Sequence, residues 1–94
     1  MASALQHIRQ AFRGGLCRFS IHALEEMDED GLSEADVEEA VMNGALVATL
    51  TEDPRGRRFV VRGLGLDRET RIELVCRFLP SSILRIITVY AIEE

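Results

Sequence analysis

The sequence contains no lysine and only two cysteines, Cys17 and Cys76. Two cysteines do not make the disulfide framework of a small secreted domain, and no C-x-x-C motif is present. Cys76 lies within the apolar run LVCRF, which is typical of a small buried hydrophobic residue. No feature of the sequence near Cys17 favours a thiolate, so a structural role is preferred over a catalytic one for both thiols.

Long hydrophobic runs are absent as well. No apolar run approaches the roughly 20 residues that a transmembrane helix needs. The N-terminal segment MASALQHIRQAF lacks the apolar core of a signal peptide. With 47% hydrophobic and 29% charged residues, the composition is that of an ordinary globular protein. We therefore expect a single cytoplasmic domain over residues 1–94, with no membrane contact.

Charge is distributed unevenly along the chain. The formal net charge is −5, and residues 25–39 carry nine acids and no base. From residue 55 onward, eight arginines stand against five acids. Because lysine is absent, the positive charge rests on arginine, whose planar guanidinium group binds phosphate bidentately. An acidic first half is thus followed by a mildly basic second half.

The first half is predicted to form two to three short helices. Apolar residues recur there at spacings of three and four, serines stand at N-cap positions, and glycines follow the last periodic residues. These signals place helices over residues 4–12, from Ser20 to Gly31 and from Ser33 to Gly44.

The period changes to two after Gly44, which predicts β-strands. Short turns separate the strands, and short connections favour antiparallel pairing. The expected strands span residues 45–52, 57–64, 70–78 and 83–92. The predicted fold class is α+β, with the N-terminal helices packed on a four-stranded antiparallel β-sheet.

Alternation along the predicted strands collects arginines on the face that points away from the helices. If Ile87 and Val89 lie in the core, Thr88 and Tyr90 join that face. Such a face could bind a phosphodiester backbone. The alternative is a solvated surface on which Glu73 pairs with neighbouring arginines. The polar residues expected on this face are Arg58, Arg62, Arg71, Glu73, Arg77, Thr88 and Tyr90.

His22 has three interpretations. Together with Glu26, four residues later, it could bind a metal ion, but no H-x-x-x-H or H-E-x-x-H motif is present and a metal site is disfavoured. A histidine is also a natural general acid or base near neutral pH. The third interpretation is a residue at the start of a helix that packs toward the sheet. His7, the other histidine, is expected on the surface.

Three segments resemble one known family. They are S-x-H-A-L-E-x-M-x-E-D-G-L-S-x-x-D-V-E-x-A at Ser20–Ala40, D-P-R-G-x-R-F-V-V-x-G at Asp53–Gly63 and R-I-I-T-V-Y at Arg85–Tyr90. Together they resemble the bacterial domain of unknown function 4258, across residues 4–91. The resemblance implies a RelE- or barnase-like ribonuclease fold and a link to toxin–antitoxin systems.

The sequence departs from this family at three positions. Many members have arginine where this chain has Glu26 and Asp30, and histidine where it has Glu73. If the family's histidine is an acid or a base, then Glu73 either replaces it or the chemistry is lost.

Two hypotheses follow from the resemblance and the arginine-bearing face. The first is a toxin-type, metal-independent ribonuclease without a cofactor, whose partners would be RNA and a cognate antitoxin. In it, His22, Glu73 and Tyr90 would be catalytic, and the substrate would be bound by Arg58, Arg62, Arg71 and Thr88. The second is a non-catalytic protein-binding or regulatory module that uses the acidic helices or an uncovered sheet edge, or that forms a homodimer.

Overall fold

The structure is a computed structural model that describes residues 3–93. The ends of the expected 1–94 domain, residues 1–2 and 94, lie outside this range. The described chain forms three helices, α1 (Ala4–Arg13), α2 (Ile21–Asp30) and α3 (Glu34–Asn43). It also forms five strands, β1 (Cys17–Phe19), β2 (Ala45–Leu50), β3 (Arg58–Leu64), β4 (Arg71–Phe78) and β5 (Leu84–Ala91).

Serine N-caps start all three helices, which confirms the two predicted caps at Ser20 and Ser33. Each serine side chain accepts a hydrogen bond from the backbone N–H three residues later. The Ser20 hydroxyl also donates to the carbonyl of Ile87 at 2.9 Å. This bond fixes the start of α2 against β5. Gly31, at φ 68°, ends the same helix in the left-handed conformation that glycine adopts without strain.

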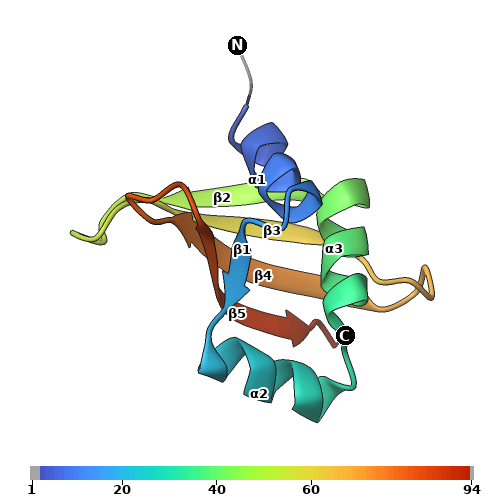
Figure 1. The fold of residues 1–94 in the computed structure, drawn as a ribbon. Coiled ribbons are helices and arrows are strands. Elements are labelled where there is room, and N and C mark those ends of the chain that lie inside the picture. Colours follow the sequence, from blue (N-terminus) through green and yellow to red (C-terminus); the bar gives the residue numbers. More distant parts are fainter. Residues whose placement is uncertain (1–2, 94) are drawn as a thin grey trace.

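The sheet has five strands in the order β1-β5-β4-β3-β2 (Figure 1). Strands β2 to β5 form the predicted antiparallel meander. The expectation of a four-stranded, purely antiparallel sheet was wrong, because β1 pairs in parallel with the first half of β5. A strand of three residues is too short for an alternation pattern, and its partner lies more than sixty residues away in the sequence. Local sequence therefore gave no signal for it.

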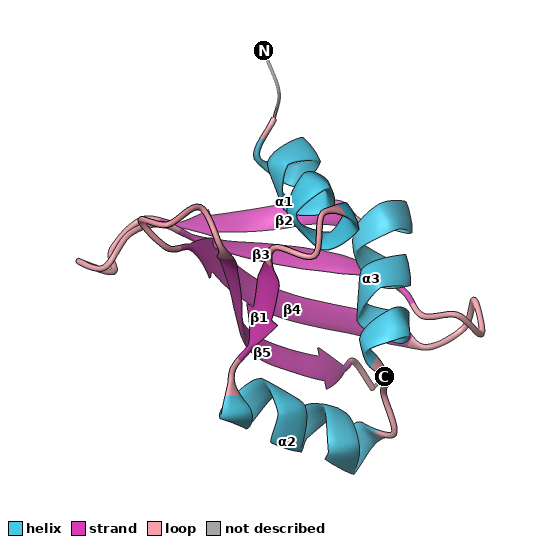
Figure 2. Ribbon diagram, viewed as in Figure 1, coloured by secondary structure: helices cyan, strands magenta, loops and turns pink. Residues whose placement is uncertain are grey.

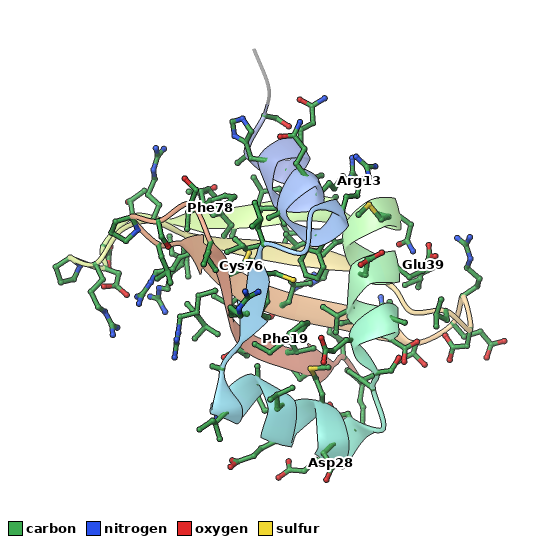
Figure 3. The ribbon with its side chains drawn as sticks, in the orientation of Figure 1. Arg13, Phe19, Asp28, Glu39, Cys76 and Phe78 are labelled. Carbon is green, nitrogen blue, oxygen red and sulfur yellow. The ribbon has the colours of Figure 1, made fainter. Side chains whose placement is uncertain are left out.

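The hydrophobic core lies between one face of the sheet and the helices α1 and α3 (Figure 2), and Ala23 and Met27 of α2 also belong to it. Helix α3 crosses β3 very closely, because a Cβ added at Gly63 would lie 2.0 Å from the Ala40 carbonyl oxygen. Cys76 is fully buried in this core, as expected (Figure 3). Burial raises the pKa of its thiol to about 12, so the side chain is an inert apolar group.

A β-bulge decides which side chains of β5 are buried. Val75 pairs with Thr88 while Cys76 pairs with Ile86, so Ile87 is an extra residue between them. Val89 is buried, as predicted, but the core position expected for Ile87 is taken by Ile86. The bulge leaves Thr88 and Tyr90 opposite Val75 and Glu73, on the face away from α1 and α3.

Candidate nucleic-acid interface

The face of the sheet opposite α1 and α3 is here called the outer face. Helices α1 and α3 pack on the other face, and α2 lies along the edge of β5 (Figure 1). Strand pairing places these residues on the outer face: Arg18 of β1, Arg58, Val60 and Arg62 of β3, Arg71, Glu73, Val75 and Arg77 of β4, and Arg85, Thr88 and Tyr90 of β5.

Four arginines form a row across the strands at one end of this face. Arg18 is the Cα partner of Arg85, and Arg85 is the partner of Arg77. The antiparallel register that pairs Phe59 with Cys76 puts Arg58 opposite Arg77. We call Arg18, Arg85, Arg77 and Arg58 the arginine row. Adjacent strands lie about 4.8 Å apart, so the row spans about 14 Å from its first Cα to its last.

One carboxylate counters the positive charge at the β3 end of the row. Asp53 Oδ2 lies 3.6 Å from Arg58 Nε and 3.8 Å from Arg77 Nη1. Hydrogen bonds from the side chain and backbone of Arg55 hold the pKa of Asp53 below its usual range. Arg58 Nε is buried and has no hydrogen-bond partner among the described residues. No ion pair joins Arg18 or Arg85 to a carboxylate in residues 3–93, so the row keeps net positive charge.

A second row crosses the middle of the outer face. Arg62 pairs with Glu73, and Glu73 pairs with Tyr90. Arg62 Nε donates to Glu73 Oε1 at 2.8 Å, and Glu73 is only 8% exposed. The predicted pairing of Glu73 with a neighbouring arginine is thus present. This row brings one carboxylate, one guanidinium group and one phenol together.

Apolar side chains separate the two rows. Val60 is buried although it points away from the main core, and Val75 is partly buried beside it. Thr88, the partner of Val75, supplies a hydroxyl group in this strip. Any ligand that spans both rows must therefore cross a short hydrophobic strip.

Arg71 lies at the far end of the outer face, two residues before Glu73 on the same strand. Together with Arg62 and Arg68 it lines a recess of about 380 Å³ beside Gly63 and Asn43. The Asn43 side chain fixes this corner, because it exchanges two hydrogen bonds of 2.8 Å with the backbone of Leu64. The recess thus places three arginines beside one another, of which Arg62 pairs with Glu73 and Arg68 lies 3.9 Å from Glu39.

His22 lies apart from these residues. It is on α2, its side chain is 67% exposed, and its Nε2 lies 3.3 Å from Glu26 Oε1. The expectation that it packs toward the sheet was wrong, because Ala23 and Met27 form the buried side of α2. Strand β5 lies between His22 and Glu73. Within residues 3–93, no group of three or more His, Cys, Asp or Glu side chains could hold a metal ion.

Glu26 and Asp30 accept backbone hydrogen bonds along the part of the β5 edge that does not pair with β1. Glu26 Oε1 accepts a hydrogen bond from the Val89 N–H at 3.2 Å, and Asp30 Oδ2 accepts one from the Ala91 N–H at 2.8 Å. An arginine at either position would have no acceptor for these donors. These two acids therefore have a structural role that their sequence did not reveal.

Three residues of the interface were missed in the sequence analysis. Arg18 was missed because β1 was not recognised. Arg85 was not assigned a role because the bulge that fixes its side of the sheet is a tertiary feature. Asp53 lies in a turn, where its contacts with Arg58 and Arg77 depend on how β3 and β4 pair.

Comparison with known proteins gives one family. The model of the family described as "Domain of unknown function (DUF4258)" matches residues 19–91, which include the whole second row and the arginine row except Arg18. No curated protein and no solved structure matches the sequence. No helix among residues 3–93 is long and apolar enough to cross a membrane. Since the match covers more than half of the chain, the protein belongs to the DUF4258 family.

Proposed function

We propose that the outer face binds the sugar–phosphate backbone of RNA, and that the protein is a toxin-type ribonuclease that works without a metal ion. The arginine row is the observation that carries this proposal. A protein with a formal net charge of −5 concentrates four guanidinium groups on one side of its sheet. One guanidinium group can donate two parallel hydrogen bonds to a phosphate group. Such phosphate contacts supply most of the affinity for a nucleic-acid backbone.

Glu73 is the proposed general base. Its carboxylate takes the proton of a ribose 2′-hydroxyl group, and the 2′ oxygen attacks the adjacent phosphorus. The bond from phosphorus to the 5′ oxygen breaks, and that oxygen takes a proton from water. Glu73 then returns its proton to the hydroxide. The products are a 2′,3′-cyclic phosphate and a 5′-hydroxyl end.

The neighbouring residues have supporting roles in this mechanism. Arg62, which contacts Glu73, and Arg58 in the arginine row stabilise the charge that develops on the phosphate oxygens. Tyr90 and Thr88 orient the phosphate through their hydroxyl groups, and Arg71 binds the strand further along. His22 lies on α2, across strand β5 from Glu73, so it takes no part in this proton transfer. A cognate antitoxin would inhibit the protein by covering the outer face.

Binding is tested by titrating a fluorescent single-stranded RNA at several salt concentrations. The affinity falls as salt rises, and each lost phosphate contact should make the negative slope of log K against log salt shallower by about 0.7. Arg85→Gln should therefore weaken binding and flatten the slope. Arg13→Gln is the matched control, because Arg13 is an exposed arginine of α1 on the helical side (Figure 3). Equal losses in both variants would contradict binding by the outer face.

Cleavage is tested with Glu73→Gln, which keeps an oxygen that can accept the Arg62 hydrogen bond. Cleavage should fall by about 10²- to 10⁴-fold, the usual contribution of a general base, while RNA binding persists. Growth after induced expression in a bacterial host gives a second readout, with His22→Ala tested in parallel. The wild type should arrest growth, and Glu73→Gln should relieve the arrest while soluble protein accumulates.

The second candidate is a non-catalytic protein-binding module that forms a homodimer through β2. Strand β2 is an open edge without a charged residue, and Val47 and Leu50 are 45% and 38% exposed. Normal growth with abundant folded wild type, and a dimeric mass lost in Val47→Lys, would favour this candidate over the ribonuclease.

A further inference from the structure

A groove of about 410 Å³ lies on the helical side of the sheet, between α1, β1 and α3. It faces away from the arginine row, and the proposed ribonuclease chemistry makes no use of it. Phe12, Phe19, Met42 and Leu66 form its apolar lining. Figure 3 shows Phe19 of β1 and Glu39 of α3 on this side of the sheet.

The apolar lining is fixed at one end and exposed at the other. Phe12 and Phe19 pack edge to face, with ring centroids 6.4 Å apart and an interplanar angle of 81°. Leu66, in the turn between β3 and β4, is 55% exposed. The Leu66 N–H is bound to Asp36 Oδ1 at 3.0 Å, which holds this turn against α3. The groove is thus a formed surface that leaves hydrophobic area in contact with water.

Glu34 and Glu38 line the same groove, one helical turn apart on α3. Both are exposed, and neither forms an ion pair with a residue in the described range 3–93. The helix dipole stabilises Glu34 in the first turn of α3, but Glu38 lies beyond that turn. Burial, followed by the field of these two carboxylates, raises the pKa of the Cys17 thiol, which also lines the groove.

We propose that this groove binds a short, basic, amphipathic segment of a partner protein. Apolar side chains of the segment would cover Phe19, Met42 and Leu66, and its arginine or lysine side chains would pair with Glu34 and Glu38. Charge complementarity decides the class of partner, because two unpaired carboxylates repel RNA and attract a cationic peptide. The partner and the RNA would occupy opposite sides of the sheet, so both could bind at once.

The probe is a synthetic 14-residue helix with leucines on one side and arginines on the other. A peptide of the same composition in scrambled order is its control. Glu34→Gln with Glu38→Gln should weaken binding of the helix at least 10-fold. Glu25→Gln with Glu29→Gln is the matched control, since these exposed glutamates of α2 have the same spacing and charge. It should change the affinity less than 2-fold.

Cys17 provides a second readout, because it lines the groove and Cys76 is fully buried. The helix should slow maleimide labelling of Cys17 at mildly alkaline pH at least 5-fold. Equal weakening by the two double variants, equal binding of the scrambled peptide, or unchanged labelling of Cys17 would each overturn the proposal. These results are independent of RNA cleavage, so a failed ribonuclease assay leaves them interpretable.

Discussion

Arg62 and Glu73 form an ion pair of 2.8 Å at the centre of the outer face, between neighbouring strands. The Glu73 side chain is 11% exposed, whereas that of Arg62 is 56% exposed. The buried carboxylate is thus paired with a guanidinium group that is itself open to solvent.

Replacing Arg62 with alanine should destabilise the protein, because Glu73 would stay buried without this partner. We expect the free energy of unfolding to fall by about 1–3 kcal/mol, the usual cost of an unsatisfied buried polar group. Urea denaturation measures the change. Glu73→Gln should cost less, since its amide needs no counter-charge. An Arg62→Ala variant with an unchanged urea midpoint would show that solvent already satisfies Glu73.

Removing the carboxylates at the edge of β5 should expose its backbone. In Glu26→Ala and Asp30→Ala, the amides of Val89 and Ala91 lose their acceptors, at a cost of about 1 kcal/mol for each bond. Hydrogen exchange should speed up at Val89 in the first variant and at Ala91 in the second. Asp28→Ala is the control, because Asp28 is exposed on α2 and accepts no such bond from β5 (Figure 3). Exchange that is equally fast in all three variants would contradict the edge-closing role.

Stability should fall in acid, because Asp36, Asp53 and Asp67 have lowered pKa values in the folded state. Hydrogen bonds from the Thr70 hydroxyl and from the Glu69 and Thr70 amides lower the pKa of Asp67 to about 2. The Ser33 amide, followed by that of Leu66, lowers the pKa of Asp36. In the unfolded chain the pKa of aspartate is about 3.9. As the pH falls, the unfolded chain therefore takes up protons at these carboxylates before the folded chain does. The stabilisation is therefore complete above about pH 4 and is lost as the pH falls toward 2.

Asp67→Asn tests this assignment by chemical denaturation between neutral pH and pH 2. The variant should lose less stability than the wild type over the acidic part of that range, because asparagine does not titrate. Identical pH profiles for the two proteins would assign the acid sensitivity to other groups.

Gly63→Ala should strongly destabilise the fold. The new Cβ would lie 2.0 Å from the carbonyl oxygen of Ala40, and a backbone atom cannot rotate away. Separating α3 from β3 should cost at least the 1–3 kcal/mol that is typical of an overpacked core. Gly14→Ala is a milder control, since its nearest contact would be 3.3 Å. Thermal unfolding distinguishes the two variants, and similar melting temperatures would contradict the close approach.

Predictions from local sequence were most accurate where neighbouring residues determine the structure. The serine caps at Ser20 and Ser33, and the glycine at Gly31, set the helix boundaries as expected. Alternation in β3 and β4 correctly placed Arg58 and Arg62 opposite the core. The same argument failed at Ile87, because a bulge adds one residue and shifts the alternation of β5. The fifth strand was missed because its three residues become a strand only by pairing with Leu84–Ile86.

The sequence alone determined the helix starts, the meander of four strands and a supply of arginines for one face, because these depend on caps, turns and a period of two. Only the tertiary structure aligned Arg18, Arg85, Arg77 and Arg58 in one row, since that alignment depends on register between strands distant in the sequence. It also turned Glu26 and Asp30 of α2 toward the edge of β5 and separated His22 from Glu73. The physical reason is that hydrogen bonds between strands, unlike caps and turns, join residues whose separation along the chain carries no local signal.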